Sequence, residues 1–252
     1  MTTANTTERA ATRVARRIVS EIQEHDLPPG TRLDPEHLMV EKQGVARGTV
    51  REALRFLELH GTVKLRPGPR GGPVVSVPEL DHLVSALSLQ LQFADATFRS
   101  VLEARRSVYP VLVAEAAENA TAEDIAALRQ CLVRLGDARN SSEATTQEAR
   151  HFHELIAVAS KNLVLGLLVN ALHQMSDAGA DYNLEHREAN HRQSGRILRA
   201  IEQGDAGKAR DLSEKMHAAA WRYWETTAPD LLDAPVTWLT PGSGSTSRAS
   251  AS

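Results

Sequence analysis

The hydrophobic period of the sequence changes near residue 60 and changes back near residue 78, and this double change most constrains the fold. Before residue 60, apolar residues recur every three or four positions, as on one face of a helix. Segments 62–65 and 74–77 instead look like two short strands, and the residues between them are rich in Gly and Pro. After Pro78 only a helical period is found. The pattern predicts a small helical module that ends in a β-hairpin, followed by an all-helical region.

Glycine and proline divide the first part of the chain into three helices. The first, over about residues 8–25, ends at a segment with two prolines and a glycine, which cannot continue a helix. The second begins near Pro35 and stops before Gly44, and the third runs from Arg47 to about His60. Three helices followed by a hairpin are typical of a winged helix-turn-helix. We therefore predict such a DNA-binding domain over residues 1–77.

The remainder of the chain is predicted to be a helical bundle, so the fold class is mainly α. Thr121-x-x-Asp124 resembles a capping box at the start of one helix. From residue 227 the chain becomes rich in Pro, Gly and Ser, which predicts a disordered tail over 227–252 and a helical domain over 78–226. The predicted helices cover residues 79–93, 97–119, 121–138, 142–159, 161–178, 184–203 and 206–226.

Composition restricts the class of protein. Residues 1–77 hold 12 basic and 9 acidic residues, a net charge of +3, whereas the remainder holds 17 and 23, a net charge of −6. A basic module on an acidic body is expected if only the first module meets a polyanion.

The single cysteine, Cys131, excludes an internal disulfide framework. The N-terminus lacks the apolar core of a signal peptide, and no segment approaches the roughly 20 apolar residues of a membrane span. We expect a cytoplasmic protein with no membrane partner.

The third helix carries the candidate chemistry. Arg47, Arg51 and Arg55 recur every four residues and form a stripe beside the apolar face of the helix. Such a row of guanidinium groups suits the major groove of DNA, where Arg binds guanine in bidentate fashion or holds a phosphate. Thr49, in the first turn, is placed to reach a phosphate or a thymine methyl group. The alternative is an ordinary solvated face, on which the arginines pair with glutamates of the same helix.

The predicted hairpin adds a second basic element. Arg66 and Arg70 flank its turn, where neighbouring glycines allow a close approach to the DNA backbone or minor groove. The arginine stripe, the helix-turn-helix spacing and this basic hairpin together favour a DNA-binding surface over a solvated face.

The sequence resembles the GntR family of bacterial regulators. The segments that carry the resemblance are Leu27-Pro28-Pro29-Gly30-Thr31-Arg32-Leu33, Pro35-Glu36-x-Leu38, Gly44-Val45-Ala46-Arg47, Thr49-Val50-Arg51-Glu52-Ala53-Leu54 and Leu57-x-x-x-Gly61. The helical part is similar to the FCD-type domain of the FadR-like subfamily, through Arg105, Ala116-Ala117, Thr121-x-Glu123-Asp124, Phe152-His153, Ser160-Lys161-Asn162 and Ala200-Ile201-x-x-Gly204-Asp205. The resemblance covers about residues 8–226.

The resemblance implies a homodimer on a palindromic operator, with one recognition helix in each half-site. It implies DNA contacts by Arg47 and Arg51, helped by Thr49 and by hairpin glycines such as Gly71. Two departures from the family pattern are expected to alter the operator sequence or affinity. Ala46 replaces a small hydroxyl residue, and His37 stands where some relatives have a basic residue.

Many FCD-type domains hold a divalent metal ion with one Asp and three His. The resemblance places these ligands at Ala149, His153, Ser194 and Met216, so only one of four is retained. Because such sites need three or four protein ligands, we expect no metal ion and no other cofactor. An alternative uses neighbouring residues after a shift in helix register. These residues are Glu148, His191 and His217, together with His153.

Without a metal, Arg105 becomes the candidate for holding an anionic effector, because a buried guanidinium without a partner is costly. The alternative is an ion pair between Arg105 and a helix neighbour. Loss of charged ligands makes the cavity more apolar, which favours a larger carboxylate over a small hydroxy acid. The predicted effector-binding residues are Arg105, His153, Ser194 and Met216.

These features predict a ligand-responsive transcription factor, most simply a repressor that a small molecule releases from double-stranded DNA. The alternative is a constitutive dimeric DNA-binding protein whose helical domain only dimerises. An enzyme is not expected, since no nucleophile elbow, phosphate loop or His-Glu-x-x-His pattern is present.

Overall fold

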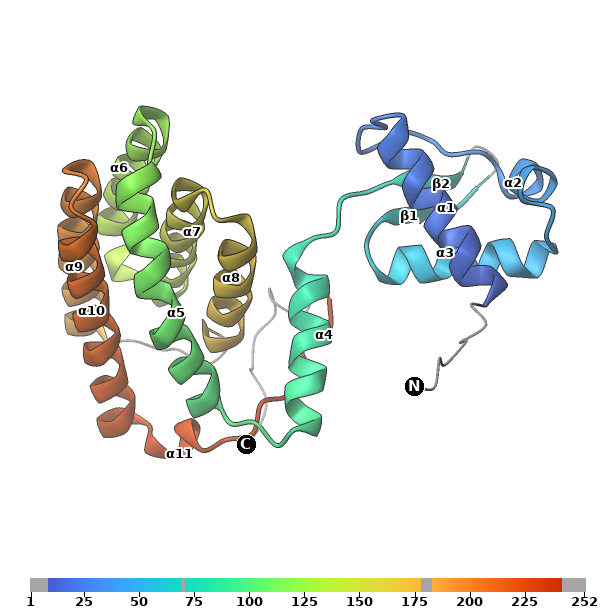
Figure 1. The fold of residues 1–252 in the computed structure, drawn as a ribbon. Coiled ribbons are helices and arrows are strands. Elements are labelled where there is room, and N and C mark those ends of the chain that lie inside the picture. Colours follow the sequence, from blue (N-terminus) through green and yellow to red (C-terminus); the bar gives the residue numbers. More distant parts are fainter. Residues whose placement is uncertain (1–8, 69–70, 178–182, 242–252) are drawn as a thin grey trace, which may run out of the picture. The chain divides into compact units, whose positions relative to one another are not determined.

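The computed structural model describes residues 9–68, 71–177 and 183–241, and the chain divides into two compact units, Met1–His82 and Leu83–Ser252. The first unit contains α1 (Ala10–Glu24), α2 (Glu36–Gln43), α3 (Arg47–Leu59), β1 (Val63–Arg66) and β2 (Gly72–Val75). Its three helices begin and end within two residues of the predicted bounds (Figure 1).

The core of the first unit lies between α1 and α3. Val14 and Ile18 of α1 are buried in one cluster with Val50, Leu54 and Leu57 of α3. These residues recur every three or four positions, which is the reason each helix presents a single apolar face. The face of α3 opposite this core is left for charged side chains.

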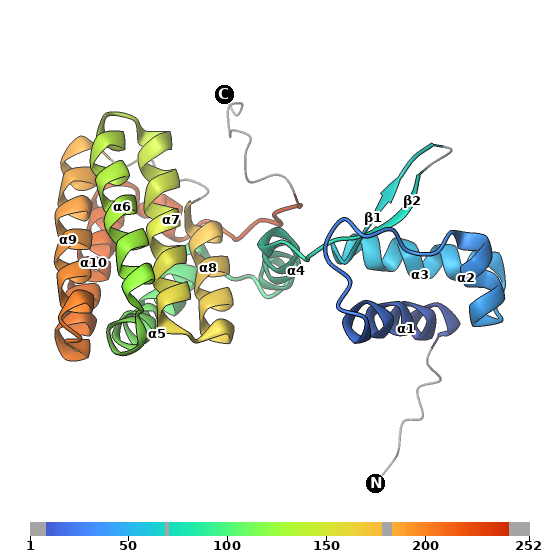
Figure 2. The same cartoon turned by 90° about the horizontal axis from the view of Figure 1, so that it is seen from above.

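The hairpin pairs β1 with β2 in antiparallel fashion, from Val63 opposite Val75 to Arg66 opposite Gly72. It extends from the end of α3 (Figure 2). An isolated bridge between Arg32 and Val74 adds a short third segment, with the amide of Val75 donating to Thr31 O across 2.8 Å. The sequence did not predict this third segment, which ties the loop after α1 to the hairpin.

The second unit is a helical bundle, so the fold is mainly α, as predicted. Its helices are α4 (Leu80–Phe93, which begins just before the unit boundary), α5 (Phe98–Asn119), α6 (Ala122–Asp137), α7 (Ser142–Ser160), α8 (Leu163–Asp177), α9 (Leu184–Glu202), α10 (Ala206–Thr227) and α11 (Pro229–Leu232). A 3-10 turn, Ala138–Asn140, joins α6 to α7. None of the helices in the described part of the chain has both the length and the apolar character needed to span a bilayer.

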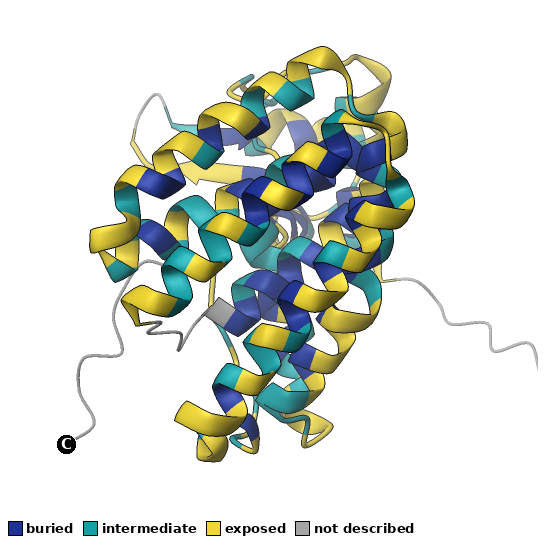
Figure 3. Cartoon of the chain, turned by 90° about the vertical axis from the view of Figure 1, so that its left-hand side faces the viewer, coloured by how far each residue is buried: buried dark blue, intermediate teal, exposed yellow. Residues whose placement is uncertain are grey.

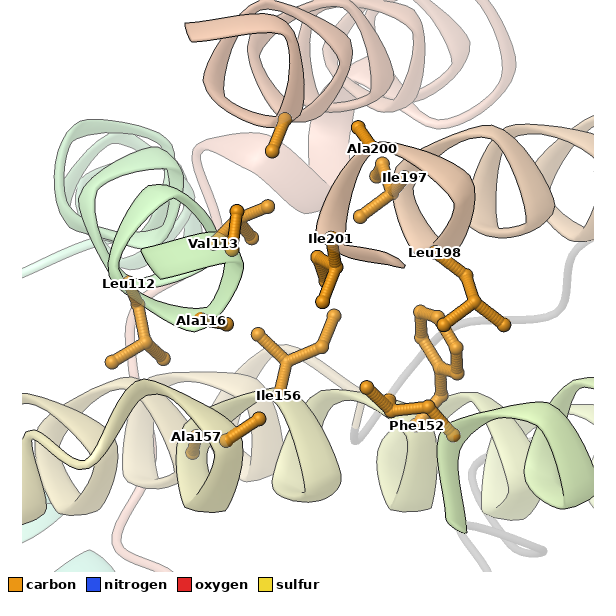
Figure 4. Close-up of a cluster of buried hydrophobic side chains, with 14 of the residues drawn as sticks. Leu112, Val113, Ala116, Phe152, Ile156, Ala157, Ile197, Leu198, Ala200 and Ile201 are labelled. Carbon is orange, nitrogen blue, oxygen red and sulfur yellow. The ribbon is translucent and has the colours of Figure 1, made fainter. Parts of the chain in front are cut away.

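Helix α5 organises the bundle, because it packs against α7, α8, α9 and α10. Buried residues follow the inward faces of the helices and exposed residues the outward faces (Figure 3). Side chains from α5, α7 and α9 converge in the core, among them Leu112, Phe152, Ile156 and Ile201 (Figure 4). This core holds the helices that supply the lining of the cavity described below.

The predicted tail differs from the structure between residues 228 and 241. Helix α11 follows α10 directly, and its Leu232 is buried against Leu102 and Trp224. Beyond it, the backbone amide and indole nitrogen of Trp238 donate to Gln92 Oε1 (2.7 Å) and Ser85 Oγ (2.9 Å) on α4. Pro, Gly and Ser content alone predicted disorder, but leucine and tryptophan side chains fasten this segment to the bundle. Residues 242–252 lie outside the described part of the chain.

Candidate functional site

The outer face of α3 presents the predicted arginine stripe to solvent. Val50, Leu54 and Leu57 are buried on the opposite face. The side chains of Arg47 and Arg51 are 65% and 55% exposed, and Arg55 is also exposed. The solvated-face alternative predicted pairing with glutamates of α3. Glu58 instead accepts a hydrogen bond from the backbone amide of Leu65 (3.0 Å).

Glu36 of α2 connects the two leading arginines. Its Oε2 accepts from Arg51 Nε at 2.9 Å and from Arg47 Nε at 3.3 Å. Burial alone would raise the pKa of Glu36, but the hydrogen bonds from Arg51 and Arg47 outweigh it and lower the pKa below its ordinary value. All three side chains are substantially exposed, so these pairs contribute little free energy.

The other predicted DNA-binding residues are distributed around this face. Thr49 is half-buried in the first turn of α3, and His37 is exposed at the start of α2. The N-cap residue of α3, Ala46, makes no side-chain capping bond, in keeping with the loss of a hydroxyl at that position. Arg66 is exposed at the end of β1, whereas Arg70 lies outside the described residues.

Gly71 has a structural role in the hairpin. Its amide donates to Gly68 O (2.8 Å), and a Cβ atom at Gly71 would lie 2.1 Å from the carbonyl oxygen of Arg66. Only a residue without a side chain fits so close to the backbone. A DNA contact by Gly71 stays a prediction.

The second unit contains a cavity of about 340 Å³ between its helices. Three predicted residues, Arg105, His153 and Met216, line it, as does Ala149. Ser194, which was also predicted to bind the effector, is buried in α9 and is not among the lining residues. Within the described lining there are six arginine or lysine side chains and no carboxylate. They are Arg105, Arg150, Arg187, Arg192, Arg196 and Lys215.

Arg105 is the most deeply buried of these cations, with 9% of its surface exposed. Its Nη1 donates to Ser176 Oγ across 2.6 Å, and its Nε lies 3.4 Å from Nε2 of His217. No carboxylate of the described residues pairs with it, which is contrary to the intramolecular ion-pair alternative. Neutral partners leave the charge of a buried guanidinium uncompensated.

Three histidines and a tyrosine surround this guanidinium. Nδ1 of His153 is hydrogen-bonded to the hydroxyl of Tyr109, and the ring of His153 stacks on that of His173 with centroids 4.1 Å apart. Burial and the positive charge of Arg105 hold the pKa of His153 well below its usual range. Burial also lowers the pKa of His217, to about 3. The rings are therefore neutral at physiological pH, and Arg105 is the charged group of the cluster.

The described residues do not fit the divalent metal ion that the family pattern implies. Ala149 and Met216 provide no ligand atom of the expected kind. The alternative set fails as well, since His191 Nε2 is hydrogen-bonded to Leu132 O (3.2 Å) and His217 Nε2 faces a guanidinium. In the part of the chain that the structure describes, no group of three or more His, Cys, Asp or Glu is arranged to hold a metal.

His173 was not predicted from the sequence as a residue of the cavity. His173 lies in the middle of α8, a helix without a charged residue before Asp177, and no motif accompanies it. The sequence around His173 predicts only an ordinary core residue. The position of His173 beside Arg105 becomes evident from the packing of α8 against α5 and α7.

Comparison with known protein families matches both units. The model "Bacterial regulatory proteins, gntR family" matches residues 10–71, and the FCD domain model matches residues 100–219. The chain belongs to the GntR family. It is a transcriptional regulator with an FCD domain, and GntR regulators bind DNA operators.

Relatives of this GntR-family regulator are also transcriptional regulators. The HTH-type transcriptional regulator LutR of Bacillus subtilis is 30% identical over 59% of this chain and 67% of its own length. The HTH-type transcriptional regulator Mce2R of Mycobacterium tuberculosis is 29% identical over 63% of this chain and 66% of its own length. The match therefore spans about two thirds of each relative.

A solved structure supports the fold. The Streptococcus agalactiae GntR structure superposes with a TM-score of 0.70 and 22% identity, covering 84% of this chain and 99% of that one. This likeness in fold and the two family matches agree with the predicted winged helix-turn-helix and FCD-type architecture.

Proposed function

We propose that this regulator binds a palindromic operator as a homodimer, represses transcription there, and is released by an anionic small molecule held in the cavity of the helical unit. The proposal depends most on one observation. Val50, Leu54 and Leu57 anchor α3 from one side while Arg47 and Arg51 remain exposed on the other. A helix held in this way can enter the major groove without losing its packing.

The proposed DNA contacts follow from the exposed face of α3. Arg47 and Arg51 exchange Glu36 for base edges or phosphates, and Arg55 continues the row toward the end of the helix. Thr49 and His37 contribute phosphate contacts, and Arg66 contacts the flanking backbone from the hairpin. Sequence preference in this scheme comes mainly from Arg47 and Arg51.

We propose that the homodimer forms through the outer face of α8. Four of its apolar side chains, Leu163, Val164, Leu167 and Leu168, are between 45% and 75% exposed. The helix carries no charged residue before Asp177, so two copies of this face meet without repulsion between like charges. A helix that is apolar on nearly all sides is normally covered, and a second copy of this chain provides a matching apolar cover.

The effector is proposed to be a carboxylate with an apolar skeleton, bound without a metal ion. The guanidinium of Arg105 supplies the positive charge at the buried end of the cavity. The skeleton would lie against Ala149, Met216 and Ala220, which line the same cavity. Such a ligand releases the operator only if it binds the DNA-free arrangement of the dimer more tightly than the DNA-bound one.

The direct test is selection of binding sites from a random duplex library with the purified full chain. Enrichment of a sequence with two-fold symmetry supports the proposal. The enriched duplex then serves in titrations with a library of carboxylates, some of which are expected to weaken DNA binding. Failure to enrich any sequence would contradict operator recognition, and operator binding insensitive to every carboxylate would favour the constitutive dimer instead.

A further inference from the structure

His173 carries a buried polar atom that the fold leaves without a partner. The ring lines the cavity and is 2% exposed. Among the described residues, no group hydrogen-bonds to its Nε2 atom. Buried polar atoms in proteins nearly always have a partner, so an orphaned atom beside a cavity indicates that something in the cavity supplies one.

The protonation of His173 identifies what kind of partner is needed. Its Nδ1 lies 3.0 Å from the carbonyl oxygen of Val169 in the preceding turn of α8. A carbonyl only accepts, so Nδ1 must carry the hydrogen. Burial, together with the neighbouring His153 and Arg105, holds the pKa of His173 well below its usual range, and the ring is neutral. In that tautomer Nε2 has a free lone pair and is an acceptor.

Two nitrogen atoms of the neighbouring rings are already engaged. Nε2 of His217 faces Arg105 Nε at 3.4 Å, and Nδ1 of His153 is hydrogen-bonded to the hydroxyl of Tyr109. The acceptor of His173 is therefore available to a ligand in a way that these two atoms are not.

We propose that His173 Nε2 accepts a hydrogen bond from a hydroxyl or N–H group of the effector, placed next to the anionic group that Arg105 binds. This inference rests on the proposed effector site and specifies its ligand as an anion with an adjacent hydrogen-bond donor. His173 is then a specificity-determining residue. The guanidinium of Arg105 and the ring of His173 together bind the two effector groups that a metal ion would otherwise chelate.

The structure places the two groups within reach of one small ligand. Ser176 accepts from Arg105 Nη1 across 2.6 Å and donates to the backbone carbonyl of His173 across 3.0 Å. A single serine thus connects the guanidinium to the turn of α8 that bears the ring. His153 stacks on His173 and lines the same cavity. We expect a carboxylate and a hydroxyl on adjacent carbons to reach both groups.

The test uses pairs of acids that differ only in the donor group. Lactate is compared with propionate, mandelate with phenylacetate, and phenyllactate with phenylpropionate, each titrated calorimetrically into the full chain. In at least one pair we expect the α-hydroxy acid to bind about tenfold to hundredfold more tightly, because its analogue leaves the buried acceptor unpaired. His173→Phe should remove this preference, and His173→Gln, which restores an acceptor oxygen, should recover part of it.

The possible outcomes separate the inference from the function on which it rests. Equal binding of both members in every pair, or an unchanged preference in His173→Phe, overturns the role of His173 and leaves an anion site at Arg105. Binding of no acid at all overturns the effector proposal as well, whereas operator selection is measured independently. Ni²⁺ alone should not bind. Tight binding of Ni²⁺ that His173→Phe abolishes would mean that the lone pair serves a metal, which also overturns the inference.

Discussion

The guanidinium of Arg51 donates to the carboxylate of Glu36 across 2.9 Å, so the principal candidate for base recognition on α3 is held by an acidic side chain of α2. The same carboxylate also accepts from Arg47. Glu36 thereby contacts both of the arginines that we propose to meet DNA. A DNA phosphate or a guanine edge must replace it, and the negative charge of Glu36 opposes any DNA that fails to provide a good replacement.

Glu36→Gln should therefore increase DNA affinity and reduce discrimination. The substitution removes one negative charge from the DNA-facing surface and weakens both ion pairs, each of which contributes only about 0–1 kcal/mol. We expect binding to random-sequence duplexes to become about twofold to tenfold tighter, with a smaller gain on the selected operator. Fluorescence anisotropy with both duplexes measures the ratio. Asp34→Asn, which alters the exposed pair with Lys42, is the matched control. A Glu36→Gln protein with weaker binding to both duplexes would contradict this role.

Arg105→Gln should abolish the response to carboxylates without impairing operator binding. The substitution removes the buried positive charge while keeping a polar side chain that can still bond to Ser176. We expect loss of a charge-assisted pair to weaken carboxylate binding by at least about tenfold. Calorimetry and operator titrations with and without the acid separate the two effects. Arg129→Gln, at an exposed ion pair with Glu202, serves as control. An Arg105→Gln protein that still binds the acid normally would rule out the proposed anchor.

Leu167→Glu should dissociate the homodimer. Two copies of the substituted face would bring carboxylates together in an apolar contact, which is strongly unfavourable. Leu167 is 45% exposed, so the folded monomer tolerates the charge. We expect sedimentation to shift from dimer to monomer and operator affinity to fall, because each subunit then binds its half-site alone. Val133→Glu on α6, at a side chain that is 65% exposed, should leave the dimer intact. Dimers that persist in Leu167→Glu would exclude α8 as the contact.

Acid should destabilise the helical unit through its buried histidines. The pKa of His217 is about 3 in the folded chain against about 6.5 when unfolded, because burial and the charges of Arg105 and Arg106 disfavour its protonation. Below about pH 6.5 the unfolded state therefore binds more protons, and the stability present at higher pH is lost as pH falls toward 3. The pKa values of His153 and His173 are lowered in the same direction.

Between about pH 5.5 and pH 4 the expected loss from His217 approaches about 1.4 kcal/mol per pH unit, and His153 and His173 add loss in the same direction. Urea unfolding of the full chain at a series of pH values measures it. His217→Gln should show a shallower decline than the parent chain, since one group no longer titrates between the two states. A stability that is independent of pH between about 7 and 5 would contradict the neutral, buried state of the cluster.

Local sequence signals predicted most of the fold. The capping box at Thr121 is present, with the hydroxyl of Thr121 accepting from the amide of Asp124 (3.2 Å) and the carboxylate of Asp124 accepting from the amide of Thr121 (2.8 Å). The bounds of the long helices follow from the same kind of information. Periodicity, glycine and proline act within a few residues, which is why they can be read from the chain directly.

Features that depend on distant contacts were not predictable in this way. The bridge between Arg32 and Val74, and the attachment of Trp238 to Ser85, join residues far apart in sequence, and the segments around Arg32 and Trp238 have no regular period. In the cavity, the family pattern led to Arg105, His153 and Met216, which line it, whereas Ser194 is not among the lining residues. His173 was found only because packing places its ring against His153.

The most direct test of DNA recognition by α3 is the affinity of Arg51→Ala for the operator selected with the parent chain. We predict a loss of about 1–3 kcal/mol on that operator, with a smaller loss on random duplexes and relaxed base preference at one position in each half-site. Arg129→Ala, in the helical unit, should bind like the parent. An Arg51→Ala protein with unchanged affinity and unchanged base preference would show that the exposed arginines of α3 do not read DNA, and the central claim would fail.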